Sequence, residues 1–177
     1  MKHAAISIFF ILSVILSGQS AAAQQPNFSG TWALDAEKSF SNGAQFDQNM
    51  TIVHEGQTIK IEAQQKTARG ATTIKEEYVI NGQAMDFTPQ GTPPNAKGKR
   101  KTSWLPNGQG ILIEDEITVD GKLLRQISRK WTLGPDGKTL VVDLFIDDQR
   151  GSFEQKRVFT KNKRNQPAFC GGGILQD

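Results

Sequence analysis

The sequence predicts an all-β protein, an antiparallel up-and-down meander of eight to ten strands that closes into a barrel or half-barrel. Short alternating segments rich in Ile, Val, Thr and aromatic residues recur about every ten residues, with Gly-containing turns between them. No long stretch shows helical periodicity. A long antiparallel meander exposes its edges unless it curls, which favours closure. We expect ten strands, at residues 28–35, 49–54, 58–65, 72–80, 83–88, 99–105, 110–119, 122–133, 138–147 and 152–161.

The first residues have the pattern of a secretory signal peptide. Lys2 precedes an apolar run from Ile6 to Leu16, and small residues follow at Ala21 and Ala23. The run is too short for a membrane-spanning helix, and the small residues form an Ala-x-Ala cleavage site typical of bacteria. We expect a periplasmic or extracellular protein, cleaved near Ala23, without stable membrane insertion. The expected organisation is 1–23 signal peptide, 24–161 barrel domain and 162–177 flexible tail.

Composition disfavours several classes of function. The net charge of +3 is low for a nucleic-acid-binding protein, and the one basic run, Lys97 to Lys101, is interpreted as a solvated loop. A mobile loop is expected over 88–99, which holds three Pro and two Gly. Cys170 is the only cysteine, so no internal disulfide is expected. His54 is expected at the surface near a turn. Without a His/Cys cluster we expect no metal site and no cofactor.

Two turns predict strand registers. Asn81-Gly82 favours a two-residue type I′ loop, which would pair Tyr78 with Met85 and Glu76 with Phe87.

The second turn, Val119-Asp120-Gly121, fits a three-residue loop that places Asp115 opposite Arg125 and Ile113 opposite Ile127. A two-residue Asp-Gly loop is the alternative. It would shift the register by one and set an apolar face beside a polar face.

The first and last strands resemble those of the calycin superfamily, the lipocalins and fatty-acid-binding proteins. Phe28, Gly30, Trp32 and Leu34 share one face, and Gly-x-Trp resembles the first strand of calycins, in which Trp32 would plug one barrel end beside Gly30. Arg157-Val158-Phe159 resembles the Arg-x-Tyr ending of fatty-acid-binding proteins, with Phe159 in the Tyr position. The resemblance, to small secreted bacterial lipocalin-like proteins in particular, implies a barrel with a ligand cavity. Residues 36–48 are too few for the two-helix lid of fatty-acid-binding proteins.

Alternation places several charged side chains on the inward, apolar face: Glu76, Asp115, Arg125, Arg129 and Arg157. Buried charges must be paired or solvated, so one interpretation is a set of structural pairs, Asp115 with Arg125 first, in a water-containing lumen. Another is that arginines form a fork with Gln155 for an anionic head group. A third uses Glu76 and Asp115 as acid and base, but no spacing requires it, and we expect no catalytic residues and no enzyme.

The sequence thus predicts a binding protein for a small hydrophobic or amphiphilic molecule, with or without an anionic group, held in the barrel. The alternative is a non-enzymatic interaction protein with a filled barrel, such as a protease inhibitor or an envelope-complex component. Cavity volume separates the two, and the oligomeric state stays open. The expected ligand-binding residues are Arg157, Arg125, Arg129, Gln155, Tyr78, Trp104, Trp131 and Phe153, with Phe87 as further apolar lining, and the expected structural residues are Trp32, Gly30, Asp115 and Glu76.

Overall fold

The computed structural model describes residues 25–42, 47–67 and 70–162, and in them the predicted all-β fold is confirmed. The described residues contain no helix, and therefore none that is long and apolar enough to cross a membrane. All ten predicted strands are present, with ends within three residues of the prediction; the two-residue β2 is additional. In chain order the strands are β1 (Gly30–Leu34), β2 (Phe40–Ser41), β3 (Asp47–Glu55), β4 (Thr58–Thr67), β5 (Gly70–Val79), β6 (Ala84–Phe87), β7 (Ala96–Trp104), β8 (Gly110–Val119), β9 (Lys122–Leu133), β10 (Thr139–Asp148) and β11 (Gly151–Lys161).

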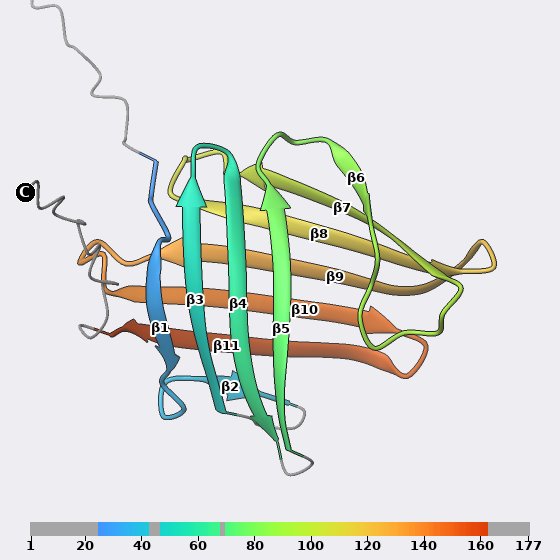
Figure 1. The fold of residues 1–177 in the computed structure, drawn as a ribbon, viewed down its shortest axis with the longest axis horizontal. Coiled ribbons are helices and arrows are strands. Elements are labelled where there is room, and N and C mark those ends of the chain that lie inside the picture. The colour runs from blue at the N-terminus through green and yellow to red at the C-terminus, as the bar shows by residue number, and fades with distance from the viewer. Residues whose placement is uncertain (1–24, 43–46, 68–69, 163–177) are drawn as a thin grey trace, which may run out of the picture.

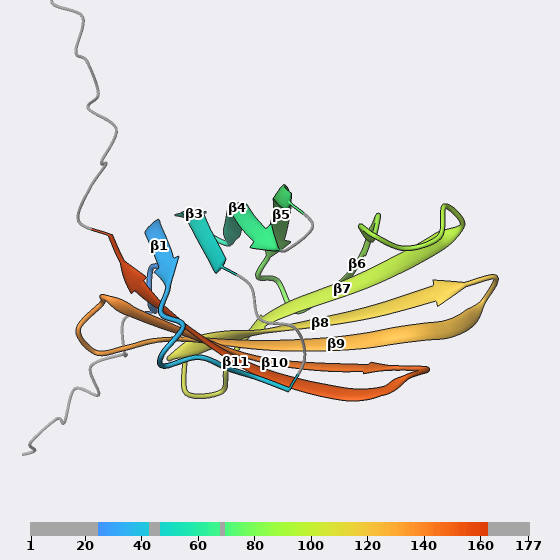
Figure 2. The same cartoon turned by 90° about the horizontal axis from the view of Figure 1, so that it is seen from below.

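The strands form one antiparallel sheet that curls into a half-barrel. Their order is β5-β4-β3-β1-β11-β10-β9-β8-β7-β6, and β2 pairs with β11 off this path. Figures 1 and 2 show that β1 and β3–β5 form a layer crossing above the long strands β7–β11. The layers join where β1 pairs with β11, and they diverge on the opposite side. Since β5 and β6 are the two ends of the order, the barrel stays open between them.

The closed end, near β1, holds the apolar core. Trp32 is fully buried, and its indole Nε1 donates a hydrogen bond to the Phe28 carbonyl oxygen over 3.0 Å. The Lys161 ammonium lies 5.2 Å from the centre of the Trp32 ring. A Cβ on Gly30 would lie 2.3 Å from Lys161 Cε, and its φ of +147° also favours glycine. Trp32 therefore lies in the buried closed end, and Gly30 lies against the Lys161 side chain that covers it.

The predicted pairing around Asn81-Gly82 is wrong. Gly82 has positive φ but Asn81 does not, and the Asn81 side-chain oxygen instead accepts a hydrogen bond from the Gln83 N–H over 2.9 Å. A type I′ loop needs positive φ at both positions. The chain therefore leaves β5 without forming a hairpin, and β6 pairs with β7, Met85 facing Arg100. The sheet ends at β5 for this reason.

The predicted three-residue loop between β8 and β9 is also wrong. Val119 pairs with Lys122 across a two-residue Asp120-Gly121 turn, in which both residues have positive φ. A β-bulge then shifts the register, so Leu124 has no partner and Ile117 faces Arg125. The extra residue keeps the two apolar faces together, which a two-residue loop alone would not. As a result Asp115 faces Ile127 and not Arg125.

The basic run belongs to a strand. β7 begins at Ala96, so the predicted loop over 88–99 is too long and the basic residues do not lie in it. Lys97, Lys99 and Lys101 alternate outward with the inward Gly98 and Arg100. Arg100 is 8% exposed, which contradicts its interpretation as a solvated residue.

Candidate functional site

A cavity of about 580 Å³ lies between the two layers of the half-barrel. Its volume is within the usual range of small-molecule sites, about 300–1,000 Å³. Apolar side chains form much of its wall: Met50, Ile61, Ile74, Phe87, Val142, Leu144, Ile146 and Phe159. Four arginines also line it, Arg100, Arg125, Arg129 and Arg157.

A charged cluster, Glu76, Tyr78, Arg100, Asp115 and Arg129, lines the cavity where β5 approaches β7. Arg100 donates from Nε to Asp115 Oδ1 over 2.6 Å and from Nη2 to Oδ2 over 2.8 Å. The same Nη2 donates to Glu76 Oε1 over 3.0 Å, and Arg129 Nη1 donates to Asp115 Oδ2 over 2.7 Å. The Tyr78 hydroxyl donates to Glu76 Oε2 over 2.6 Å. Strands β5, β7, β8 and β9 are thereby joined through side chains.

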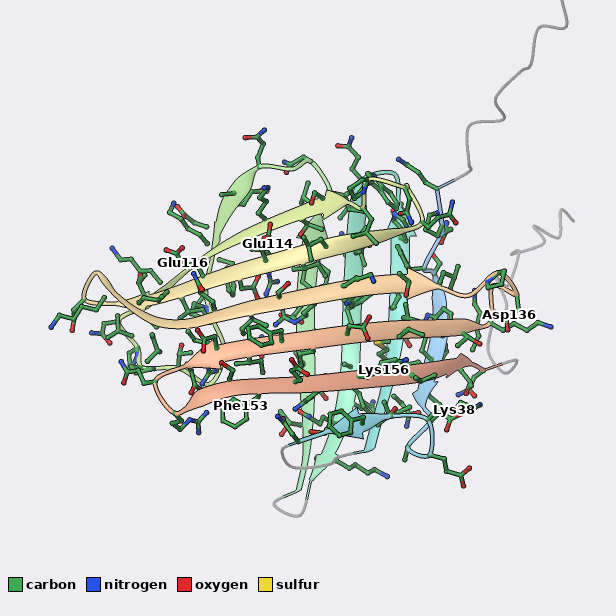
Figure 3. All side chains as sticks on the ribbon, turned by 180° about the vertical axis from the view of Figure 1, so that it is seen from behind. Lys38, Glu114, Glu116, Asp136, Phe153 and Lys156 are labelled. Atoms are coloured by element: carbon green, nitrogen blue, oxygen red, sulfur yellow. The ribbon has the colours of Figure 1, made fainter. Side chains whose placement is uncertain are left out.

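Alternation explains why Asp115 alone enters the cluster from the acidic run of β8. Asp115 is 4% exposed, whereas its neighbours Glu114 and Glu116 are exposed. Figure 3 shows Glu114 and Glu116 on the outer face of the long strands. Of the described residues, no group of three or more His, Cys, Asp or Glu could hold a metal ion.

The cluster keeps Asp115 ionised. Burial by itself would raise the pKa of Asp115, but the hydrogen bonds and charges of Arg100 and Arg129 outweigh burial and lower it. Burial raises the pKa of the Tyr78 hydroxyl well above its usual range. At neutral pH the cluster therefore contains ionised arginine and aspartate groups and a neutral tyrosine.

Two aromatic rings flank the Arg100 guanidinium. Its carbon lies 4.6 Å from the centre of the Tyr78 ring and 4.2 Å from that of Phe87. Phe87 packs over Gly98, where a Cβ would lie 2.4 Å from its ring. Cation–π contacts of this kind add to the attraction between partly desolvated groups.

Arg157, on β11, has two neutral amide oxygens among its hydrogen-bond acceptors. Its Nη2 and Nε donate to Gln155 Oε1 over 2.6 and 3.1 Å, and its Nη1 donates to Gln48 Oε1 over 3.3 Å. Burial, aided by repulsion from Arg129, lowers the pKa of Arg157 to about 10. The guanidinium is still charged at neutral pH, but burial and Arg129 make its charge less favourable than in water.

The predicted Asp115–Arg125 pair does not form. Arg125 Nη2 donates instead to Asp148 Oδ2 over 3.3 Å, because the bulge moves Arg125 away from Asp115. The Asp148 side chain is 5% exposed. Hydrogen bonds from the Arg150 side chain and backbone lower the pKa of Asp148 to about 2. The predicted inward position of Arg125 is nevertheless found.

The predicted ligand residues divide into two groups. Arg125, Arg129, Arg157, Tyr78 and Trp131 line the cavity, as do the predicted structural residues Asp115 and Glu76. Gln155, Trp104 and Phe153 do not belong to its lining.

Each of those three has another place in the fold. Gln155 holds Arg157, and Trp104 packs against the closed-end core near His54. Phe153 lies toward the other end of β11, where the Arg150 guanidinium approaches its ring at 5.7 Å.

His54 is buried, contrary to the prediction of a surface position. It is 8% exposed, and its Nδ1 accepts a hydrogen bond from the Phe28 N–H over 3.3 Å. Its ring stacks on Phe28 with the ring centres 5.6 Å apart. Burial lowers the pKa of His54. His54 is therefore part of the closed end and not of the cavity.

Arg100 is the main site residue that the sequence interpretation missed. The four cations between residues 97 and 101 outweighed the alternation that separates Arg100 from the three lysines. Gly98, Arg100 and Thr102 lie on one face of the strand at two-residue spacing, and the lysines lie on the other face. The uncharged residues Gly98 and Thr102 on either side of Arg100 were the signal that this face points inward. Cys170 lies outside the described residues.

Comparison with known proteins finds similar folds. No protein-family model matches the chain, and no curated protein does. The zebrafish ileal bile acid-binding protein, solved in complex with cholic acid, is 14% identical with a TM-score of 0.48, over 76% of this chain and 98% of that one. The fatty-acid-binding protein of Manduca sexta is 14% identical with a TM-score of 0.44, over 76% and 99%. The S-type phycobiliprotein lyase CPES of Guillardia theta is 8% identical with a TM-score of 0.49, over 77% and 89%.

The curled antiparallel meander itself confirms the predicted fold class. At TM-scores below 0.5 the similarity is limited to the general course of the chain. What the cavity can bind follows from its own residues.

Proposed function

We propose that this protein binds a small amphiphilic molecule with an anionic group, held in the half-barrel cavity. The observation that carries the proposal is a cavity of about 580 Å³ that combines an apolar wall with one buried and three partly buried guanidinium groups. An apolar pocket with a few convergent polar groups is the usual form of a small-molecule site. The volume also supports a hollow barrel over the alternative of an interaction protein with a filled barrel.

The charge balance of the lining favours an anion. Apart from the exposed rim residues Lys75, Glu77 and Asp86, four arginines line the cavity, and the carboxylates that bond to them there are the half-buried Glu76 and the buried Asp115. Asp148 holds Arg125 from outside the lining. A ligand carboxylate, sulfonate or phosphate would reduce the remaining positive charge, and burial strengthens that attraction.

Arg157 is the residue best placed to bind the anionic group. It donates to the oxygens of Gln155 and Gln48, which are neutral acceptors. Hydrogen bonds to a charged acceptor are stronger than those to a neutral one, so a ligand oxyanion can replace an amide oxygen with a net gain. Leu144 and Val142, from the neighbouring strand, would contact the apolar part of the ligand.

The chemistry of the cluster supports a binding role over an enzymatic one. A general acid needs a proton to give, but Arg100 and Arg129 lower the pKa of Asp115. Both Asp115 oxygens already accept hydrogen bonds from guanidinium groups. We therefore assign Asp115 to positioning the arginines.

A periplasmic or extracellular location is part of the proposal and is supported by the N-terminal sequence alone. Fractionation of cells expressing the full chain, followed by mass spectrometry of the purified protein, tests it. We expect a mature chain beginning near Gln24 in the periplasm or medium; an intact N-terminus in the cytoplasm would contradict the proposal.

Binding is tested by titrating the protein with a long-chain fatty acid and with a neutral hydrophobic probe. We expect wild type to bind the acid saturably, and Arg157→Gln to weaken acid binding by about 1.5–3 kcal/mol through loss of a charged donor. Arg150→Gln is the matched control, because Arg150 is exposed and pairs with Asp148 outside the cavity.

The neutral probe separates the possible results. Equal weakening of acid and probe by Arg157→Gln would show a change of cavity shape and not the loss of an anion contact. If wild type binds neither ligand, the filled-barrel interaction protein replaces this proposal.

A further inference from the structure

One side of the half-barrel has a seam, defined here as the boundary between β5 and the β6–β7 hairpin. Within the described residues, the backbone pairing across it is a single parallel bridge between Ile80 and Thr102, at one end. There the Gly82 N–H donates to the Thr102 carbonyl oxygen over 2.9 Å. By comparison, β10 and β11 pair through ten residues each. The seam thus has little of the backbone ladder that holds the other strands together.

Side chains close the rest of the seam. From β7, Arg100 reaches Glu76 on β5 over 3.0 Å and lies against the Tyr78 ring at 4.6 Å. From the loop after β6, Gln90 Nε2 donates to the Lys75 carbonyl oxygen over 3.3 Å. We call these three contacts the clasp: Arg100–Glu76, Arg100–Tyr78 and Gln90–Lys75.

The cavity reaches the surface at the seam. Its lining includes Lys75 and Glu77 on the β5 side, and Met85, Asp86 and Gln90 on the opposite side. Met85 is 45% exposed, and the Asp86 side chain is 85% exposed. Figure 2 shows that the two layers diverge on this side, between β5 and β6. The residues on both sides of the seam therefore also form the rim of the cavity.

Opening the clasp leaves the buried charges paired. When Glu76 moves away, Arg100 keeps both of its hydrogen bonds to Asp115 and its contact with the Phe87 ring. Glu76 is already half-buried at the seam and can be hydrated as it leaves. Removing one partner of a buried pair is costly mainly when it strands a charge, and here it does not. Side-chain contacts also break and reform faster than a strand ladder.

We propose that the seam is the entrance of the cavity, and that the Glu76–Arg100 contact sets how fast ligands enter and leave. This inference rests on the proposed function, since it concerns the exchange of the ligand proposed above. Glu76 then acts as a gate residue, distinct from Arg157, which holds the anionic group.

Covalent closure of the seam is the first test. In a Cys170→Ser background, Lys75→Cys and Met85→Cys are joined by a flexible bis-maleimide that contains a reducible disulfide. We expect exchange of a fluorescent long-chain fatty acid to slow by at least about tenfold, as for a closed lid, and to recover on reduction. The control joins Thr51→Cys to Glu62→Cys, facing residues of β3 and β4 away from the seam.

The second test is kinetic. Glu76→Gln should raise the association and dissociation rates of the neutral hydrophobic probe together, by about fivefold, with a nearly constant dissociation constant, because the probe carries no charge for Glu76 to attract or repel. Glu62→Gln removes the exposed Lys75–Glu62 pair on the outer face and should change neither rate.

Three results are distinguishable. Slower exchange only in the seam-linked protein supports the entrance, and parallel rate increases in Glu76→Gln support the gate. Unchanged exchange in the seam-linked protein, with wild-type binding intact, overturns this inference and leaves the proposed function standing. Absence of binding in wild type overturns the proposed function, and this inference with it.

Discussion

The closed end and the middle of the half-barrel follow the same inward alternation but bury different chemistry. At the closed end, Phe28, Trp32 and His54 pack as rings, and the indole and imidazole nitrogens hydrogen-bond to the Phe28 backbone. In the middle, Arg100 and Asp115 occupy equally inward positions. Apolar burial stabilises a fold directly, whereas buried ion pairs often contribute no more than apolar residues of similar size. The difference suggests that the closed end serves stability and the middle serves binding.

The largest expected effect is at the closed end. Trp32→Ala removes a fully buried ring and its hydrogen bond, and should lower the free energy of unfolding by about 3–5 kcal/mol. Urea unfolding followed by circular dichroism measures it. A loss below about 1 kcal/mol would mean that Trp32 does not plug the barrel.

In the charged middle, a substitution should reduce stability strongly only where it leaves a buried charge without its partner. Asp115→Asn leaves Arg100 and Arg129 without their shared carboxylate and should cost about 3–5 kcal/mol. Arg125→Ala, at the partly exposed end of the cavity, should cost less than about 1 kcal/mol. Equal effects of the two substitutions in urea unfolding would contradict the register that separates Asp115 from Arg125.

Gly30 tests how tightly the closed end is built. At a φ of +147° any L side chain is strained, and Ala would also have to move the Lys161 side chain off Trp32. Gly30→Ala should therefore destabilise by about 1–3 kcal/mol, less than Trp32→Ala, in the same unfolding assay. Stability equal to that of wild type would show that the backbone at residue 30 relaxes without cost.

Changes of pH should have the smallest effects on stability, and the closed end and the charged middle should respond in different pH ranges. Burial lowers the pKa of His54, so below about pH 6.5 the unfolded state binds a proton more readily and stability falls. The pKa of Asp115 is also lowered, so its contribution is full above about pH 4 and is lost as the pH falls further. When the free energy of unfolding is measured from pH 8 to pH 3, His54→Gln should remove the pH dependence between about pH 7 and 5. The decrease in stability below about pH 4 should be unchanged. A flat wild-type profile between pH 7 and 5 would contradict the assignment to His54.

Much of the fold could be predicted because alternation and turn chemistry are local signals. They place Arg129 and Arg157 inward and give nearly every strand. They do not say which strands become edges. Asn81-Gly82 looks like a hairpin turn, yet Asn81 caps its own turn and β5 is left without β6 as a partner.

The centre of the site depends on such non-local facts. Glu76 meets Arg100 across the boundary between β5 and β7, which no turn joins. Asp115 meets Arg100 across the β7–β8 hairpin, for whose connection over 105–109 no register was predicted. The bulge at Leu124 is equally hidden, because one extra residue leaves the alternation on either side intact. The inward face could therefore be predicted for Asp115, Arg125 and Arg129, but the residue with which each pairs could not.

The bulge at Leu124 makes the tip of the β8–β9 hairpin an interchangeable unit. Because the register shifts between Thr118 and Ile117, the turn residues Asp120 and Gly121 are not what aligns Arg125 and Arg129 with the cavity. Another two-residue turn, or one that carries a fluorescent label, can be grafted between Val119 and Lys122 while Leu124 is kept. Unchanged fatty-acid binding by such a graft would confirm the independence of the tip and provide an attachment point for a reporter of cavity occupancy.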